Sequence, residues 1–340
     1  MIFRTAIFAF AILAFSQASL AGDAAKDKKT EKSEKSSKKP ATDSNKAEPG
    51  KTAGEGKKPQ FTPDAAYGAY QRGYYLSAFQ EAIKRLDADP KDAAALTLVG
   101  EIYREGAAFK PDDGEAARWY RLAANLGAPQ AQFALGALLL TGGVNLEKDR
   151  AGATVMFEKA AAQGHAGALY NLAVMVVEIG AGAQPDFTKA AELFRKAAEA
   201  GDAGAAYSYG ILLREGRGVS LDTAEAAKWL KRAADAELPS GLVEYGIMLF
   251  NGVGVEKDEA GAAKLFITAA NRKNAIAQNR LAHIYLSGRG VPKDPARAVA
   301  WNILAQSAGL KDEALDKAAA GLSEDDKKRV RDLVRLQSEF

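Results

Sequence analysis

A period of 34 to 37 residues runs through the sequence from residue 61 onward. Each copy contains a small residue, here called the anchor, which in most copies follows a large apolar residue. The seven anchors are Ala66, Gly100, Gly136, Ala173, Gly210, Gly246 and Ala282. Such a period is typical of solenoids, whose repeated supersecondary units bury apolar surface mainly against their neighbours. The sequence therefore predicts a stack of such units.

Aspartate marks a second register, at Asp112, Asp149, Asp186, Asp222, Asp258 and Asp294. Ala follows each Asp after four and eleven residues, and a large apolar residue follows it after seven. These large residues are Trp119, Met156, Leu193, Trp229, Leu265 and Trp301. The spacing predicts a helix with one buried face, here called helix B, whose first backbone N–H groups the Asp caps.

The anchor belongs to an earlier helix, helix A, whose apolar residues recur at helical spacing. A glycine anchor lets the neighbouring helix approach closely, so Gly100, Gly136, Gly210 and Gly246 are predicted to be structural, like the capping aspartates. Six residues after the anchor, glycine is expected to end helix A in five copies, at Gly106, Gly142, Gly216, Gly252 and Gly288. The copy anchored at Ala173 has Ile179 at this position, which predicts a reshaped loop.

Residues 131–164 and 206–236 resemble Sel1-like repeats, relatives of the tetratricopeptide repeat with a longer loop between the helices. The copy at 59–92 resembles an ordinary tetratricopeptide repeat through Ala66, Ala78 and Pro90. The resemblance implies an all-α, right-handed α-solenoid of stacked helix–turn–helix repeats. The expected order is a tetratricopeptide-like repeat over 61–92, six Sel1-like repeats over 93–309 and C-terminal capping helices over 310–340.

The first 60 residues differ from the repeats. Arg4, an apolar run over 7–15 and small residues before Gly22 predict a signal peptide over 1–21, cleaved after Ala21. Residues 22–60 contain 11 Lys and no Val, Ile, Leu, Met, Phe, Tyr or Trp, which predicts a disordered Lys-rich linker. We therefore expect a periplasmic or secreted protein that does not span the membrane after cleavage.

The residues that enzymes use are scarce here. The chain has no Cys, two His and a net charge of +3. His165 and His283 fall in different repeats, so they are not expected to share a metal ion. The G-x-G tracts at 216–218, 252–254 and 288–290 recur with the repeat period after helices, so we interpret them as turns and not as nucleotide loops. We expect no catalytic, cofactor-binding or metal-binding residue, no cofactor and no nucleic-acid partner.

The concave face lined by the A helices is the remaining candidate site. Its predicted partner-binding residues lie three before, or one, four and five after, the anchor. They are Glu101, Arg104, Glu105, Phe133, Tyr170, Tyr207, Arg214 and Phe250. Tyr and Arg are enriched among residues that contribute strongly to binding. A second interpretation is that the rings pack between neighbouring repeats.

These observations predict a non-catalytic, exported scaffold that binds a protein partner in the envelope. The resemblance implies roles such as restraining a sensor kinase or assembling an envelope complex. A binder of envelope polymer, such as peptidoglycan or polysaccharide, is the alternative, since groove aromatics can stack on sugars. An enzyme is the third and remote alternative. Partner identity, pathway and oligomeric state stay open.

Overall fold

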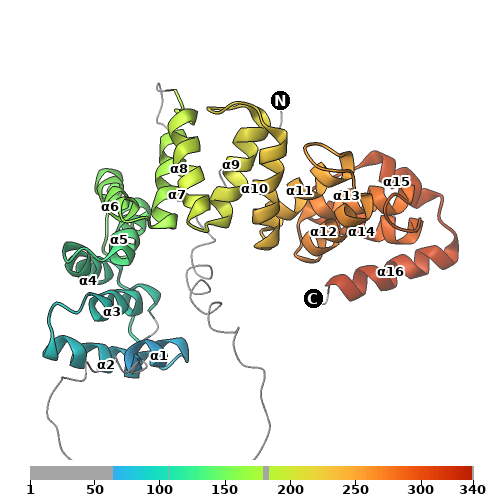
Figure 1. Cartoon of the computed structure of the whole chain (residues 1–340). Coiled ribbons are helices and arrows are strands. Elements are labelled where there is room, and N and C mark those ends of the chain that lie inside the picture. The colour runs from blue at the N-terminus through green and yellow to red at the C-terminus, as the bar shows by residue number, and fades with distance from the viewer. Residues whose placement is uncertain (1–63, 107, 179–183, 339–340) are drawn as a thin grey trace, which may run out of the picture. The chain divides into compact units, whose positions relative to one another are not determined.

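The computed structural model describes residues 64–106, 108–178 and 184–338, which contain sixteen α-helices and no strand. The predicted signal peptide and Lys-rich linker lie outside these residues. The helices are α1 Ala65–Gln71, α2 Tyr75–Ala88, α3 Ala93–Glu105, α4 Asp113–Asn125, α5 Pro129–Thr141, α6 Arg150–Ala162, α7 Ala166–Val177, α8 Phe187–Glu199, α9 Ala203–Glu215, α10 Thr223–Asp235, α11 Pro239–Asn251, α12 Glu259–Asn271, α13 Ala275–Ser287, α14 Pro295–Ser307, α15 Glu313–Ala320 and α16 Glu324–Ser338 (Figure 1).

The helices pack in chain order. From α1 to α15 each helix contacts its neighbours along the chain, and α16 packs on α14. The odd-numbered helices α3 to α13 are the A helices of six repeats, and the even-numbered helices α4 to α14 are the B helices. The predicted all-α repeat solenoid is therefore confirmed.

In the four repeats whose anchor is a glycine, the anchor packs against a large residue of helix B. A Cβ on Gly100 would lie 2.7 Å from the Tyr120 ring, and one on Gly136 would lie 2.9 Å from Phe157. These large residues follow the capping Asp by eight positions, next to the large residue seven after it that the sequence pattern singled out for the buried face of helix B. In five of the six repeats both positions hold large apolar residues, so the sequence alone does not tell which of the two contacts the anchor.

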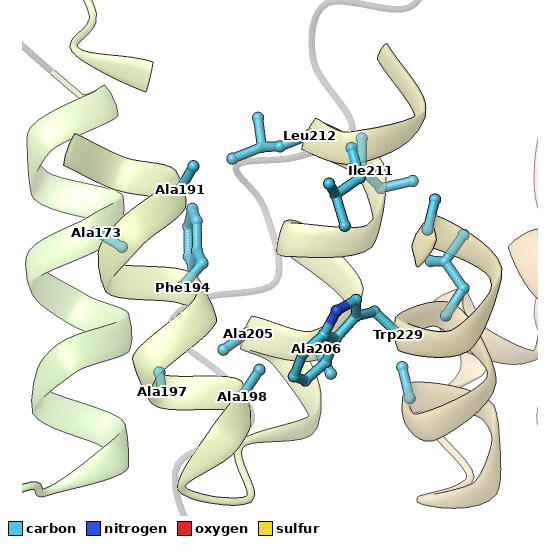
Figure 2. Packing of buried hydrophobic residues seen from close by; sticks show 14 of the residues in the cluster. Ala173, Ala191, Phe194, Ala197, Ala198, Ala205, Ala206, Ile211, Leu212 and Trp229 are labelled. Atoms are coloured by element: carbon cyan, nitrogen blue, oxygen red, sulfur yellow. The ribbon is translucent and has the colours of Figure 1, made fainter. Parts of the chain in front are cut away.

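Small side chains lie where the helices of the core contact each other and allow them to approach closely. In the cluster around α8 and α9, Ala197, Ala198 and Ala205 line the contact, and Phe194 lies beside them (Figure 2). The alanine columns of the sequence therefore correspond to close helix–helix contacts, which leave no space for larger side chains.

Every B helix of the six repeats begins with the same cap. The side chains of Asp112, Asp149, Asp186, Asp222, Asp258 and Asp294 each accept a hydrogen bond from the backbone N–H three residues later. Four A helices end at a glycine in the left-handed conformation, as at Gly216 with φ of 65°. The α7 helix differs, because it ends at Val177 and its C-cap Glu178 has φ of −81°.

The second glycine of each G-x-G tract forms the seam to the preceding repeat. A Cβ on Gly218 would lie 2.2 Å from the backbone carbonyl of Phe187, the first residue of α8. Gly254 and Gly290 approach the first residues of α10 and α12 in the same way. These glycines are needed for close packing between repeats, in addition to ending a helix.

The last two helices cover the end of the stack. Asp312 caps α15 and also accepts hydrogen bonds from Asn279 and His283 of α13, at 3.0 and 2.7 Å. On α16, Val330 is buried against α14, and Arg329 pairs with the α14 cap Asp294 at 2.9 Å.

Candidate interaction surface

The aromatic residues three before the anchor lie between neighbouring repeats. Phe133 is 8% exposed and stacks on His165, the N-cap of the next A helix, with ring centroids 4.3 Å apart. Tyr170 is half-buried and packs 5.5 Å from the Phe194 ring. A Cβ on Gly204, at the start of the next A helix, would lie 3.3 Å from Tyr170. The structure thus places both rings in contacts that hold consecutive repeats together.

Tyr207 occupies the same column in the following repeat. Burial, together with the nearby Glu244 carboxylate, raises the pKa of its hydroxyl to about 12. Tyr207 is therefore a neutral hydrogen-bonding group at any physiological pH. Its side chain is half-buried, so part of the ring still reaches the surface.

The charged residues predicted on α3 form one cluster. Arg104 pairs with Glu101 at 2.8 Å and approaches Glu105 at 4.0 Å. Burial and the carboxylate of Glu105 raise the pKa of Tyr70 on α1 well above its ordinary value. Two carboxylates face one guanidinium here, so the cluster has a net negative charge.

A matching cluster lies on α9. Arg214 forms an ion pair with Glu244 of α11 and approaches Glu215 at 3.9 Å. Here too two carboxylates face one guanidinium, although Arg217 also lies 3.4 Å from Glu215. The structure therefore brings the predicted residues of α3 and of α9 into two similar groups in different repeats.

Phe250 on α11 is covered by another part of the chain. The Arg289 guanidinium, from the next G-x-G tract, lies 4.2 Å from the centroid of its ring. Arg289 also pairs with Glu259 at 2.6 Å. Phe250 is thus half-buried under a loop of the following repeat.

Two columns of helix A stay at the surface in all six repeats. The fourth residue after the anchor is half-buried and is Arg104, Leu140, Val177, Arg214, Phe250 or Leu286. The fifth is exposed and is Glu105, Thr141, Glu178, Glu215, Asn251 or Ser287. Sequence reasoning identified Arg104, Glu105, Arg214 and Phe250 in these columns and missed Leu140, Val177 and Glu178. Reading each column across all repeats would have found them.

The two histidines have separate structural contacts. The His165 ring caps α7 by accepting the Ala168 N–H at 3.3 Å, and burial lowers the pKa of this imidazole. His283 instead bonds to Asp312. Within the described residues, no group of three or more His, Asp or Glu side chains is arranged to hold a metal ion.

A hollow of about 480 Å³ lies between α6, α7 and α8. Leu172, Met175, Val176 and Leu193 are among its lining residues, and Arg150 stands at its edge. It borders the repeat in which helix A ends without a left-handed glycine.

Among the described helices, none is both long enough and apolar enough to cross a membrane.

Comparisons with known proteins agree with this architecture. The model of the Sel1 repeat matches residues 93–127, 129–165, 166–202, 203–238, 239–274 and 275–305. No curated protein matches the chain.

Among solved structures, a Sel1 repeat protein from Oxalobacter formigenes is 29% identical, with a TM-score of 0.63 over 72% of this chain and 98% of that one. A protective antigen of uropathogenic Escherichia coli, which has an SLR fold, is 22% identical, with a TM-score of 0.54 over 81% of this chain and 68% of that one. Sel1 repeats generally mediate protein–protein interaction. With six matched repeats over most of its length, the chain belongs to the Sel1 repeat family, as the resemblance of its sequence had predicted.

Proposed function

We propose that this chain is a non-catalytic, exported scaffold of the bacterial envelope, which binds a protein partner through the surface of its A helices. The observation that carries the proposal is the pair of surface columns four and five residues after the anchor. They run through all six repeats and combine charged with apolar side chains. Restraint of a sensor kinase is one role that such a scaffold can have.

Two features support a protein partner over an envelope polymer. Stacking on sugars needs open aromatic faces, whereas Phe133 is stacked on His165 of the next repeat, and Tyr170 packs on Phe194 of its own repeat and lies beside Gly204 of the next. Protein interfaces instead combine an apolar centre with a polar rim, as these columns do. The signal-like residues 1–21 support export, and the mature chain is expected to begin at Gly22 or within a few residues of it.

Site-specific photocrosslinking in living cells tests the proposal. A photoreactive residue is placed at Thr141 or Glu215 on helix A, and matched controls carry it at Lys159 or Lys228, exposed on helix B. Crosslinks from the helix A positions to one defined envelope protein are expected, with little product from the controls. N-terminal sequencing of the recovered chain reports export.

Two further results would favour other functions. If the purified chain is retained on cell wall and no protein crosslinks at any position, the polymer-binding function replaces the scaffold. A chain that keeps residues 1–21 inside the cell would contradict the exported role.

A further inference from the structure

The side chains in the two surface columns differ between the A helices: they are charged on α3 and α9, and mostly uncharged on α5 and α7. On α3 and α9, the fourth and fifth residues after the anchor are Arg and Glu. Between them along the chain, α5 and α7 contain no charged residue. Their side chains at the fourth position are Leu140 and Val177, and at the first position Ala137 and Val174, all four half-buried.

Helices that are apolar on all sides are normally buried on all sides. The α5 and α7 helices are uncharged and mostly apolar, yet their first and fourth positions after the anchor reach the surface. The described part of the solenoid covers their other faces, where Phe133, Leu135 and Leu169 are buried. Burial of the remaining apolar side chains against a partner is favourable, because it removes them from water.

Acidic residues end three of these A helices. Glu105 and Glu215 are the last residues of α3 and α9, and Glu178 is the C-cap of α7. The carbonyl end of a helix carries partial negative charge, so a carboxylate there costs stability and a Lys or Arg is preferred. Three repeats have a carboxylate at the fifth position after the anchor, where helix stability would favour Lys or Arg. This departure indicates that these residues serve a function other than folding.

We propose that the fourth and fifth positions after the anchor on α3, α5, α7 and α9, together with the first position on α3, α5 and α7, form one interface. Ala137, Leu140, Val174 and Val177 are its apolar centre, and Glu105, Glu178 and Glu215 are its acidic edge. The partner is a protein segment in which apolar side chains are flanked by Lys or Arg. This inference rests on the proposed scaffold function and names the chemistry of its partner.

The choice of a basic partner follows from the pairing of the two arginines. Arg104 is already paired with Glu101, and Arg214 with Glu244. The side chains of Glu105 and Glu215 remain 37% exposed and lie at longer range from these two guanidinium groups, although Glu215 also lies 3.4 Å from Arg217. The α3 cluster therefore offers a carboxylate to an incoming cation, the exposed Glu178 on α7 offers another, and Glu215 shares its charge with Arg217. An acidic segment would be repelled by these carboxylates.

The test uses the full chain, with labelled methyl groups, and three synthetic peptides. One peptide has a central run of Leu and Ala between lysine-rich ends. The second has glutamate-rich ends, and the third keeps the lysines but replaces the apolar run with Ser and Gly. Only the first is expected to shift the methyl resonances of Leu140, Val174 and Val177.

A triple variant then tests the acidic edge. Glu105→Gln, Glu178→Gln and Glu215→Gln together should weaken binding of the first peptide about tenfold, since three exposed charge pairs are lost. The melting temperature should stay equal or rise, because the helix ends lose unfavourable charge. The control triple Glu81→Gln, Glu158→Gln and Glu192→Gln, on α2, α6 and α8, should bind normally.

Equal binding of the glutamate-ended peptide, methyl shifts elsewhere, or undiminished binding by the triple variant would overturn the inference. Crosslinks to an envelope protein from helix B alone would overturn it too, and would move the binding surface of the scaffold from helix A to helix B. Peptide binding as expected in a chain that is never exported would support the interface and contradict the envelope role.

Discussion

The repeats at 166–202 and 203–238 share one architecture and join their predecessors differently. In the second, α9 ends at a left-handed glycine, and Gly218 then packs on the backbone at the start of α8. Arg217 covers this seam, with its guanidinium 3.9 Å from the centroid of the Phe187 ring. The seam is closed by backbone packed against backbone.

In the repeat at 166–202, a side chain closes the seam to the preceding repeat. The α7 helix ends earlier, and Arg150 from the preceding repeat donates hydrogen bonds to the carbonyls of Met175 and Glu178, at 3.4 and 3.1 Å. The hollow of about 480 Å³ lies beside this contact. A seam made by an exposed side chain should tolerate change, whereas one made by a close backbone contact should not.

The largest expected effect is therefore at Gly218. Gly218→Ala places a methyl group on the Phe187 carbonyl and keeps a positive φ, so we expect a loss of about 2–5 kcal/mol from overpacking and backbone strain. Hydrogen exchange should show the loss first in α8 to α10, because repeats stabilise mainly their neighbours.

Gly201→Ala is the matched control. Gly201 has φ of 99°, and a Cβ added there would have no neighbour within 4 Å, so only the strain of about 1–2 kcal/mol remains. Equal losses from both substitutions would show that the close approach at Gly218 contributes nothing.

The second effect concerns the side-chain seam. Arg150→Ala removes the hydrogen bonds to the end of α7 and should cost about 1 kcal/mol, measured by chemical denaturation. Arg195→Ala, which breaks an exposed pair with Glu199 within α8, should cost about 0.5 kcal/mol or less. A loss at Arg150 as large as that at Gly218 would remove the contrast between the two seams.

Much of this could be predicted from the sequence. The anchors, the capping aspartates and the glycine at the end of helix A repeat in register, and each has a local physical cause. Contacts between repeats were harder to foresee. Phe133 and Gly218 have neighbours about 30 residues away in the chain, His165 and Phe187, so their roles follow from the packing of successive units.

The candidate surface shows the same division. The charged residues of α3 and α9 could be recognised one repeat at a time. The apolar centre at Leu140 and Val177 could not be recognised in this way, because a single leucine or valine in a helix is ordinarily a core residue, and it becomes visible only when the same column is compared across the repeats. Only its position at the surface, beside charged residues in the same column, distinguishes it.

The third effect is a gain in stability. Most B helices are followed by a glycine with positive φ, whereas Lys273 adopts φ of 62° after α12. Lys273→Gly should relieve this strain and stabilise the chain by about 0.5–1 kcal/mol, after the entropy of the unfolded state is counted. Thermal melting measures the change, and a lower melting temperature would mean that the Lys273 side chain has a stabilising contact of its own.

The smallest effect distinguishes the two kinds of seam by pH. The loop after α13 packs on the start of α12, where Glu259 is the first residue. Hydrogen bonds from Arg289 and Lys257 lower the pKa of Glu259 from its ordinary 4.5 to about 2. A carboxyl whose pKa is lowered on folding stabilises the folded state above pH 4.5, and this contribution is lost as the pH falls toward 2. It is small, because the pair is exposed.

Denaturation midpoints of the parent chain and of Glu259→Gln should therefore differ at pH 7 and converge between about pH 4.5 and 2. The seam at Arg150 bonds to backbone carbonyls, which do not titrate in this range, so the effect of Arg150→Ala should be the same at both ends of it. Equal midpoints of the parent chain and Glu259→Gln at pH 7 would show that the charge pair contributes nothing to this seam, and that Arg289 holds it through its stacking on Phe250.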